Sequence, residues 1–359
     1  MKKVLKYTLI SLLIILFLPI ALSVGLYYSA DMGEPTFSID RTDFVTVDSL
    51  RFKSCNGNYL RQNNYGLWEL TLKGDPIRRG AVNGSLVKDL LYFQETVFIN
   101  QINEIIPSDG YLKFLRFMTV IFNRNLGQYI PAEYREEIWG IAQFCTDQYN
   151  AIGTPYERQL NFHAAHDIGH TMQEYMLVGC SSFGVWNSMS ADSSLLIGRN
   201  FDFYVGDDFA KNKVISIVSP KKGYRFVSVG WAGMIGVLSG MNEEGLTVTI
   251  NAAKGSIPTS AAMPISILAR EILQYASTID EAYGIAKKHH TFVSESLLIG
   301  SAKDGRAAII EKTPTQIDLF ESPTDKIICT NHYQSEELKN DPANLENIAR
   351  SDSYYRYCK

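Results

Sequence analysis

The dipeptide Gly179-Cys180 is the first place in the sequence where the residue types suggest covalent chemistry. Cys180 follows the stretch EYMLVG and opens a predicted strand, so its thiol stands at the start of a β element. A glycine before it leaves its carbonyl open to attack by the neighbouring thiol. Such an attack would break the chain through a thioester and free the α-amine of Cys180, a base with an ordinary pKa of about 7.7–8.0. The alternative is a small, buried, unreactive strand cysteine.

Several motifs surround Cys180 in a fixed order. LKGDPIRRGAVNGSLVKDLL is followed by GCSSFGVW, IGRNFDF, GMNEEGLTVTIN and TNH. In this order they resemble the N-terminal-nucleophile hydrolases of the isopenicillin N acyltransferase (acyl-CoA:6-aminopenicillanic acid acyltransferase) type, relatives of choloylglycine hydrolases and acid ceramidases. The resemblance covers roughly Tyr65 to Arg356. It implies a four-layer αββα sandwich, self-cleavage between Gly179 and Cys180, and acyl chemistry at non-peptide amides without a metal or organic cofactor.

In IGRNFDF, Arg199 and Asp202 match the family positions that flank the nucleophile. A guanidinium near a thiol favours the thiolate, and a carboxylate can hold the α-ammonium or the arginine in place. Their spacing suits a strand end or a turn. Without the resemblance, an exposed salt bridge at a strand edge would be the better interpretation of the same two residues.

The resemblance also assigns three residues further along the chain. Asn251, which closes LTVTIN, matches the family's oxyanion-hole amide, whose NH2 donates to the developing negative oxygen. A strand-ending asparagine in a turn is its plain alternative. Asn331 in CTNHY matches the second active-site asparagine, and Arg356 in SDSYYRY matches a late arginine. Family members continue with further strands beyond this point, whereas the sequence stops at Lys359, so the resemblance leaves Arg356 and the completeness of the sheets open.

The segment FHAAHDIGH is a competing candidate site. His163, His166 and His170 have spacings of three and four, which on a helix would line one face and could hold a zinc ion with an open position. The match to the zinc-protease pattern H-E-x-x-H is imperfect, because Asp167 stands where glutamate is needed. The plain alternative is a polar segment that orients the cleavage dipeptide.

The elements that must position these residues change character along the chain. Residues 31–179 are predicted to be rich in helix, and residues 180–359 to be rich in short strands, the two together forming one structural unit. In the second part, two helical patterns cover 266–276 and 278–290, and a hairpin is expected at Asp304-Gly305. Strand clusters with an inserted helical pair predict an α+β fold of sheets covered by helices.

Residues 1–30 are predicted to be a signal anchor, with a cleaved signal peptide as the alternative. Lysines precede an apolar run from Tyr7 to Tyr28, which is long enough for a bilayer, and the next charge is Asp31. The positive flank should stay in the cytoplasm. We therefore expect a membrane-anchored protein on the periplasmic or outer cell surface, or a secreted one if the segment is cleaved.

The composition supports a folded enzyme and excludes other classes. Hydrophobic residues make up 46% of the 359 positions, and the net charge is −4, which argues against nucleic-acid binding. The cysteine count of five is odd, so at least one thiol is unpaired, and the motif order names Cys180 as that thiol. The other four could form up to two disulfides or stay reduced.

These observations predict a self-processing cysteine hydrolase or acyltransferase that acts on a small-molecule amide. Its mature form would be a non-covalent pair of self-cleaved chains. Two alternatives remain open at this stage. One is a zinc-dependent hydrolase built on the three histidines, and the other is a catalytically inactive, membrane-tethered binding protein on the same fold.

Overall fold

One large sheet crosses the molecule, and its strands come from both sides of Cys180 in the sequence. The computed structural model describes residues 2–44, 46–49, 51–106, 108–164, 167, 179–255, 261–350 and 352–358. The sheet has eleven strands. In spatial order they are β1 (Val47–Ser49), β2 (Phe52–Cys55), β3 (Asn58–Gln62), β4 (Trp68–Gly74), β7 (Val214–Pro220), β8 (Phe226–Gly230), β9 (Ser239–Asn242), β10 (Leu246–Ala252), β11 (Glu295–Ser301), β12 (Arg306–Lys312) and β13 (Ile317–Glu321).

A second, three-stranded sheet packs on the large one, and the candidate nucleophile lies just before its central strand. Its order is β14 (Lys326–Cys329), β5 (Ser181–Val185) and β6 (Leu196–Asn200). The strands β5 and β14 contact β12, and β5 also contacts β10 and β11. Strand β11 therefore has two buried faces. Leu297 and Ile299 belong to the main core, whereas Leu298 between them belongs to the core under the small sheet.

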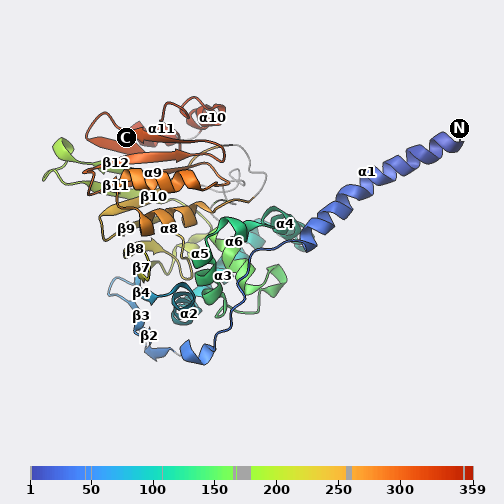
Figure 1. Ribbon diagram of the computed structural model, residues 1–359, viewed down its shortest axis with the longest axis horizontal. Helices are drawn as coiled ribbons and strands as arrows, with labels where there is room; N and C mark the ends of the chain where they lie inside the picture. Colours follow the sequence, from blue (N-terminus) through green and yellow to red (C-terminus); the bar gives the residue numbers. More distant parts are fainter. Residues whose placement is uncertain are drawn as a thin grey trace.

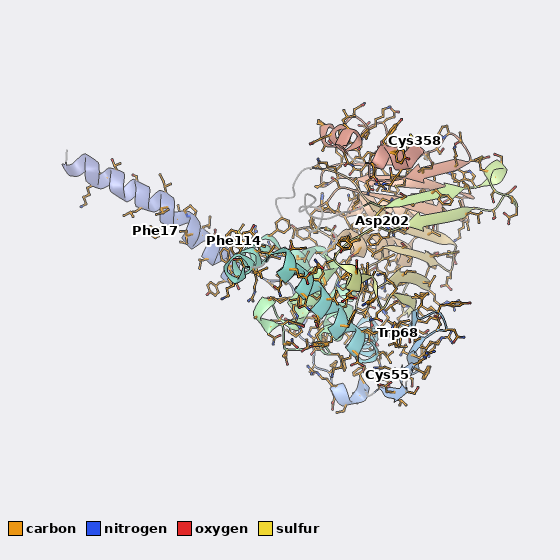
Figure 2. All side chains as sticks on the ribbon, turned by 180° about the vertical axis from the view of Figure 1, so that it is seen from behind. Phe17, Cys55, Trp68, Phe114, Asp202 and Cys358 are labelled. Carbon is orange, nitrogen blue, oxygen red and sulfur yellow. The ribbon has the colours of Figure 1, made fainter. Side chains whose placement is uncertain are left out.

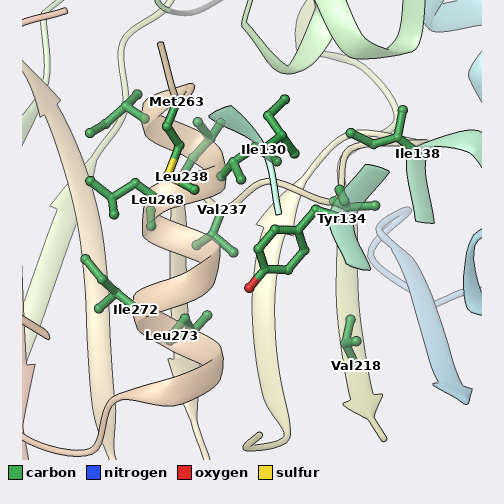
Figure 3. Packing of buried hydrophobic residues seen from close by; sticks show 14 of the residues in the cluster. Ile130, Tyr134, Ile138, Val218, Val237, Leu238, Met263, Leu268, Ile272 and Leu273 are labelled. Atoms are coloured by element: carbon green, nitrogen blue, oxygen red, sulfur yellow. The ribbon is translucent and has the colours of Figure 1, made fainter. Parts of the chain in front are cut away.

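Helices cover the other face of the large sheet (Figure 1). The helices that the structure describes are α1 (Lys2–Tyr28), α2 (Pro76–Leu86), α3 (Lys88–Ile105), α4 (Asp109–Phe122), α5 (Ala132–Ala142), α6 (Pro155–His163), α8 (Ile265–Tyr275), α9 (Ile279–Lys288), α10 (Pro342–Arg350) and α11 (Ser353–Cys358), and those that contact this face are α2, α8 and α9. Helix α2 contacts β2 to β4, α8 contacts β9 and β10, and α9 contacts β11 and β12. Figure 3 shows the core around α8, where Leu268 and Ile272 lie in one cluster with Val237 and Tyr134.

The structure confirms a mixed fold of helices and sheets. The helix-rich first part also supplies four strands, β1 to β4, to the large sheet. The strands from the two parts of the chain meet in the parallel pair β4 and β7, in which Trp68 lies opposite Val214 and Gly74 opposite Pro220. Both predicted helices downstream are present as α8 and α9, and the hairpin turns at Gly305, whose φ is +65°.

Helix α1 projects away from the rest of the molecule (Figure 1). Figure 2 shows Phe17 on the projecting part and Phe114 on α4, beside the point where α1 reaches the body. Over the residues that the structure describes, no helix is both long and apolar enough to cross a membrane.

All five cysteines lie in the described part of the chain, and each is a free thiol. Cys55, Cys180 and Cys329 are buried, and Cys358 is exposed. Cys180 is therefore unpaired, as predicted, and the other four cysteines follow the reduced alternative that the sequence left open. Cys180 must be distinguished by its surroundings.

Candidate active site

Cys180 lies at the end of the small sheet, immediately before β5, and is completely buried. Strand β5 is the central strand of its sheet, with Ser182 paired to Cys329 on one side and to Arg199 on the other. The register of these antiparallel strands thus brings the GRNFD segment next to the nucleophile. Two of the sequence motifs, GCSSFGVW and IGRNFDF, are therefore in contact through paired strands.

The Arg199 guanidinium lies beside the Cys180 sulfur. Its Nη2 is 3.8 Å from Sγ and donates a hydrogen bond to the Ile250 carbonyl at 2.6 Å. Its Nη1 donates to the Leu238 carbonyl at 2.8 Å. The predicted alternative for this residue, an exposed salt bridge, does not occur: the positive charge is held by backbone carbonyls of the large sheet and points at the thiol.

Burial has the largest influence on the pKa of the Cys180 thiol. It raises the thiol pKa above its ordinary value, because a thiolate is poorly solvated inside the protein. The Arg199 guanidinium and a backbone hydrogen bond from Asp202 lower the pKa, and the nearby Glu295 carboxyl raises it. In the uncut chain the sulfur is therefore mainly a thiol at neutral pH, next to a cation that stabilises the thiolate once it forms.

Asp202, labelled in Figure 2, follows β6 and lies beside Gly179. Its backbone oxygen accepts a hydrogen bond from the Gly179 amide at 3.1 Å. Its carboxylate accepts two hydrogen bonds from the Asn200 side-chain amide, at 2.9 and 3.1 Å. A methyl group built on Gly179 would lie 3.7 Å from the Asp202 Oδ2. The carboxylate thus lies close to the amide that becomes the Cys180 α-amine.

The two predicted asparagines come from facing sheets and are buried. Asn251 is in β10; its Oδ1 accepts from the Ser182 hydroxyl at 3.1 Å, and its Nδ2 donates to the Cys329 carbonyl at 3.1 Å. Asn331 follows β14, and its Nδ2 donates to the Ala252 carbonyl at 2.7 Å. Each side-chain amide is fixed in orientation by bonds to the opposite sheet.

Arg356, which the sequence left open, reaches the nucleophile from α11. Its Nη1 donates to the Cys180 carbonyl at 2.5 Å and to the Ser181 hydroxyl at 3.1 Å. Its Nη2 donates to Asn331 Oδ1 at 2.7 Å, and its Nε forms an ion pair with Asp352 at 3.0 Å. A helix, and not a further strand, therefore brings this arginine to the site.

Glu295 is the site residue that sequence reasoning missed. It is fully buried at the start of β11, where its backbone lies opposite Ala252. Burial raises its pKa strongly, the charge of Asp167 raises it further, and Arg199 lowers it. It is thus a buried carboxyl within electrostatic range of Cys180, and its burial favours the protonated form. The sequence offered one weak signal, a charged residue at the head of the apolar strand ESLLIGS.

His163 cannot serve as a ligand of the proposed zinc site. Its Nε2 accepts a hydrogen bond from the Ile235 amide at 2.9 Å, so Nδ1 carries the hydrogen and donates to the Gln159 carbonyl at 2.7 Å. Burial lowers its pKa to about 4, which keeps the ring neutral. Both ring nitrogens are occupied, and no lone pair is left for a metal. His166 and His170 lie outside the described residues, and the described residues contain no cluster able to hold a metal ion.

Comparison with known families assigns the part of the chain that carries these residues. Residues 188–357 match the family model described as acyl-coenzyme A:6-aminopenicillanic acid acyl-transferase. This part of the chain is similar to that family. The matched region begins downstream of Cys180 and contains all the other predicted catalytic residues, Arg199, Asp202, Asn251, Asn331 and Arg356. The resemblance seen in the motifs is thereby confirmed at the level of the family.

Proteins similar to this chain include those of an archaeon and a slime mould. An uncharacterized protein of Archaeoglobus fulgidus is 24% identical over 83% of this chain and 55% of its own length. Protein dcd1A of Dictyostelium discoideum is 24% identical over 71% of this chain and 60% of its own length. The chain thus spans somewhat more than half of the curated relatives it matches.

Two solved structures share a partial likeness with the chain. The Caenorhabditis elegans ortholog of N-acylethanolamine-hydrolyzing acid amidase matches with a TM-score of 0.35 and 16% identity, over 49% of this chain and 79% of that one. A mutant conjugated bile acid hydrolase from Clostridium perfringens matches with a TM-score of 0.32 and 16% identity, over 44% of this chain and 54% of that one. At these TM-scores the matches add nothing to the family assignment.

Proposed function

We propose that the protein is a self-processing cysteine hydrolase or acyltransferase that cleaves itself between Gly179 and Cys180 and then acts on a non-peptide amide. The observation that carries the proposal is the position of Cys180, whose sulfur is 3.8 Å from Arg199 and whose carbonyl binds Arg356. The family match downstream of Cys180 supports the same reaction class. The Asp202 carboxylate, close to the Gly179 amide bond, supports a role beside the future α-amine.

Self-cleavage requires only groups of this chain and one water. The Cys180 thiolate attacks the Gly179 carbonyl carbon, and the oxygen becomes negative in a tetrahedral intermediate. The bond from that carbon to the Cys180 nitrogen then breaks, the nitrogen takes a proton, and a thioester remains. Water hydrolyses the thioester, which gives a Gly179 carboxylate, a free thiol and a free α-amine on Cys180.

Turnover of an amide substrate repeats these steps with the new amino terminus as the base. The α-amine takes the thiol proton, the sulfur attacks the substrate carbonyl, and the same amine returns the proton to the leaving nitrogen. We assign Asn251 and Asn331 to the oxyanion, since each is a buried primary amide in a fixed orientation. Water or a second amine then takes the acyl group from sulfur.

Intact-mass measurement of the purified protein tests the proposal. We expect two polypeptides, 1–179 and 180–359, with Cys180 as the first residue of the second. A panel of simple linear amides, assayed on the same sample, tests the second reaction. A protein that stays one chain after prolonged incubation would exclude self-processing at this bond.

The rate of self-cleavage is expected to rise with pH. Because burial raises the Cys180 pKa, the thiolate is the minor form at neutral pH, and each added pH unit gives about tenfold more of it until the pKa is reached. Arg199→Gln removes a cation that lowers this pKa, so its curve should move to higher pH, with roughly tenfold slower cleavage at pH 7.

Freshly refolded chains, sampled over time at several pH values and resolved by mass, give these rates. Ser239→Ala is the matched control, because it removes one partner of the Arg199 guanidinium and keeps the charge. Circular dichroism confirms that each variant is folded. A rate independent of pH, or an Arg199→Gln curve displaced to lower pH, would contradict a thiolate-limited reaction.

The two products should remain associated after cleavage. The β4 and β7 strands belong to different products and pair along seven residue positions, from Trp68 opposite Val214 to Gly74 opposite Pro220. A buried ion pair also joins them, with Arg270 Nη2 3.5 Å from Glu137 Oε2 and both side chains 1% exposed. We expect one peak in gel filtration, even in about 1 M salt, because a buried pair is weakly screened. Elution of 180–359 by itself would disprove the pairing.

A further inference from the structure

A cavity of about 90 Å³ lies between helices α3 and α6 on one side and the segments after β6 and before β9 on the other. The aromatic residues in its wall are Phe98, Phe162, Phe201, Phe203, Phe209 and Trp231. Trp231 is held in place: its indole nitrogen donates to the Phe209 carbonyl at 2.8 Å, and Lys213 lies over its ring at 4.2 Å. The cavity is a preformed apolar site with room for a group of roughly the size of a phenyl ring.

One residue connects this cavity with the nucleophile. The guanidinium carbon of Arg199 lies 4.5 Å from the centre of the Phe201 ring, and Phe201 lines the cavity. Arg199 also donates to the carbonyl of Leu238, another wall residue, while its Nη2 faces the Cys180 sulfur. If a substrate carbonyl lies at the Cys180 sulfur, the carbon atoms next to that carbonyl can therefore extend into the cavity.

Two polar atoms in the apolar wall are buried without a hydrogen-bond partner among the described residues, Glu95 Oε2 and Gln94 Nε2. The Glu95 side chain is 1% exposed, and its other oxygen is held by Arg158 at 3.1 Å and by Gln159 at 3.2 Å. His163, the next polar wall residue, has both ring nitrogens bonded. One of the two atoms is an acceptor and the other a donor, and they belong to consecutive residues of α3 that both line the cavity.

We propose that this cavity binds the acyl part of the amide substrate and selects an apolar acyl group that carries one hydroxyl. The hydroxyl donates to Glu95 Oε2 and accepts from Gln94 Nε2, which gives both buried atoms the partner they lack. An ammonium group would leave the Gln94 donor without an acceptor, and a carboxylate would meet the Glu95 carboxyl. The inference rests on the proposed amide chemistry at Cys180.

The acyl part, not the amine part, fits this cavity because of the order of events. The amine leaves after the first step and must make room for water or a second amine. The acyl group stays bonded to sulfur until that second reactant arrives. An enclosed cavity therefore suits the acyl group, which remains bound, better than the amine, which leaves. The amine part can then leave on the side away from α3.

Binding to the uncut Cys180→Ala chain tests the proposal without any catalysis. The probes are a matched pair, 3-(4-hydroxyphenyl)propanamide and 3-phenylpropanamide, titrated by calorimetry. We expect the hydroxylated amide to bind roughly 10–100-fold more tightly, the ratio that one hydrogen bond to a charged group provides. Glu95→Gln should bring the ratio to within about twofold of unity, and Gln94→Met should reduce it several-fold.

Glu104→Gln is the matched control, because it makes the same change at an exposed position of the same helix and should leave the ratio unaltered. Arg158 keeps three other oxygen acceptors in Glu95→Gln, on Asn150, Gly153 and Thr146, and thermal unfolding checks the fold of each variant. Equal affinities for the two probes, no saturable binding of either, or a ratio that survives Glu95→Gln would overturn the proposal. Failure of self-processing would appear separately, as an uncut wild-type chain.

Discussion

Cys180→Ala is expected to yield a single polypeptide of 359 residues without amidase activity. Alanine has no nucleophilic atom, so neither the Gly179 carbonyl nor a substrate carbonyl can be attacked, and no α-amine is released. We expect the rate of amide hydrolysis to fall by at least about 10³-fold, as on loss of a covalent nucleophile. The Gly179-Cys180 bond should stay intact for as long as the protein is stable, as read by intact mass and by an amide assay on the same sample.

Cys55→Ala is the matched control for this result. Cys55 is also buried, at 3% exposure, and lies in β2 of the large sheet. The same change of a buried thiol to a methyl group should leave both cleavage and activity unaltered. If Cys180→Ala still breaks at the same bond, another group is the nucleophile. If it stays whole but remains active, self-cleavage and amide turnover are unrelated.

The sequence motifs named the candidate residues around Cys180 through the family that they resemble, and the strands that carry most of them are local features of the sequence. Ser182 pairs with Arg199 through a short connection between β5 and β6, and the hairpin at Gly305 follows from its turn residues. The central strands of the large sheet are buried on both faces and read as apolar runs. Such elements can be recognised one at a time.

What the sequence could not predict depends on contacts between distant segments. The parallel pairing of β4 with β7 adds four early strands to a sheet that otherwise follows Cys180, and neither strand specifies its neighbour. Arg356 reaches Cys180 from a helix, and its distance follows from how α11 packs. Glu295 is buried because two layers cover β11, and its altered pKa results from that burial. His163 has the spacing of a metal ligand, but both its nitrogens are used in packing.

Asn251→Ala is expected to lower kcat for amide hydrolysis by roughly 10²–10³-fold and to leave KM nearly unchanged. A primary amide has two N–H donors, and the Cys329 carbonyl takes one at 3.1 Å. The second can serve an oxygen that is negative only in the transition state, so its loss affects kcat and not the affinity for the substrate. Steady-state kinetics of the mature enzyme, corrected for the folded fraction, separate the two constants.

Two variants determine whether the loss is chemical or structural. Asn242→Ala removes a buried asparagine of the same sheet that donates to the Leu273 and Ala276 carbonyls, so it should lower the melting temperature and leave kcat per folded molecule unaltered. Ser182→Ala removes the hydroxyl that orients Asn251 Oδ1 and keeps both N–H donors, so it should reduce kcat only several-fold. The assignment of Asn251 to the oxyanion fails if Asn251→Ala raises KM at constant kcat. It also fails if Asn242→Ala loses as much kcat as Asn251→Ala, because both effects would then measure a weakened sheet and not a lost donor.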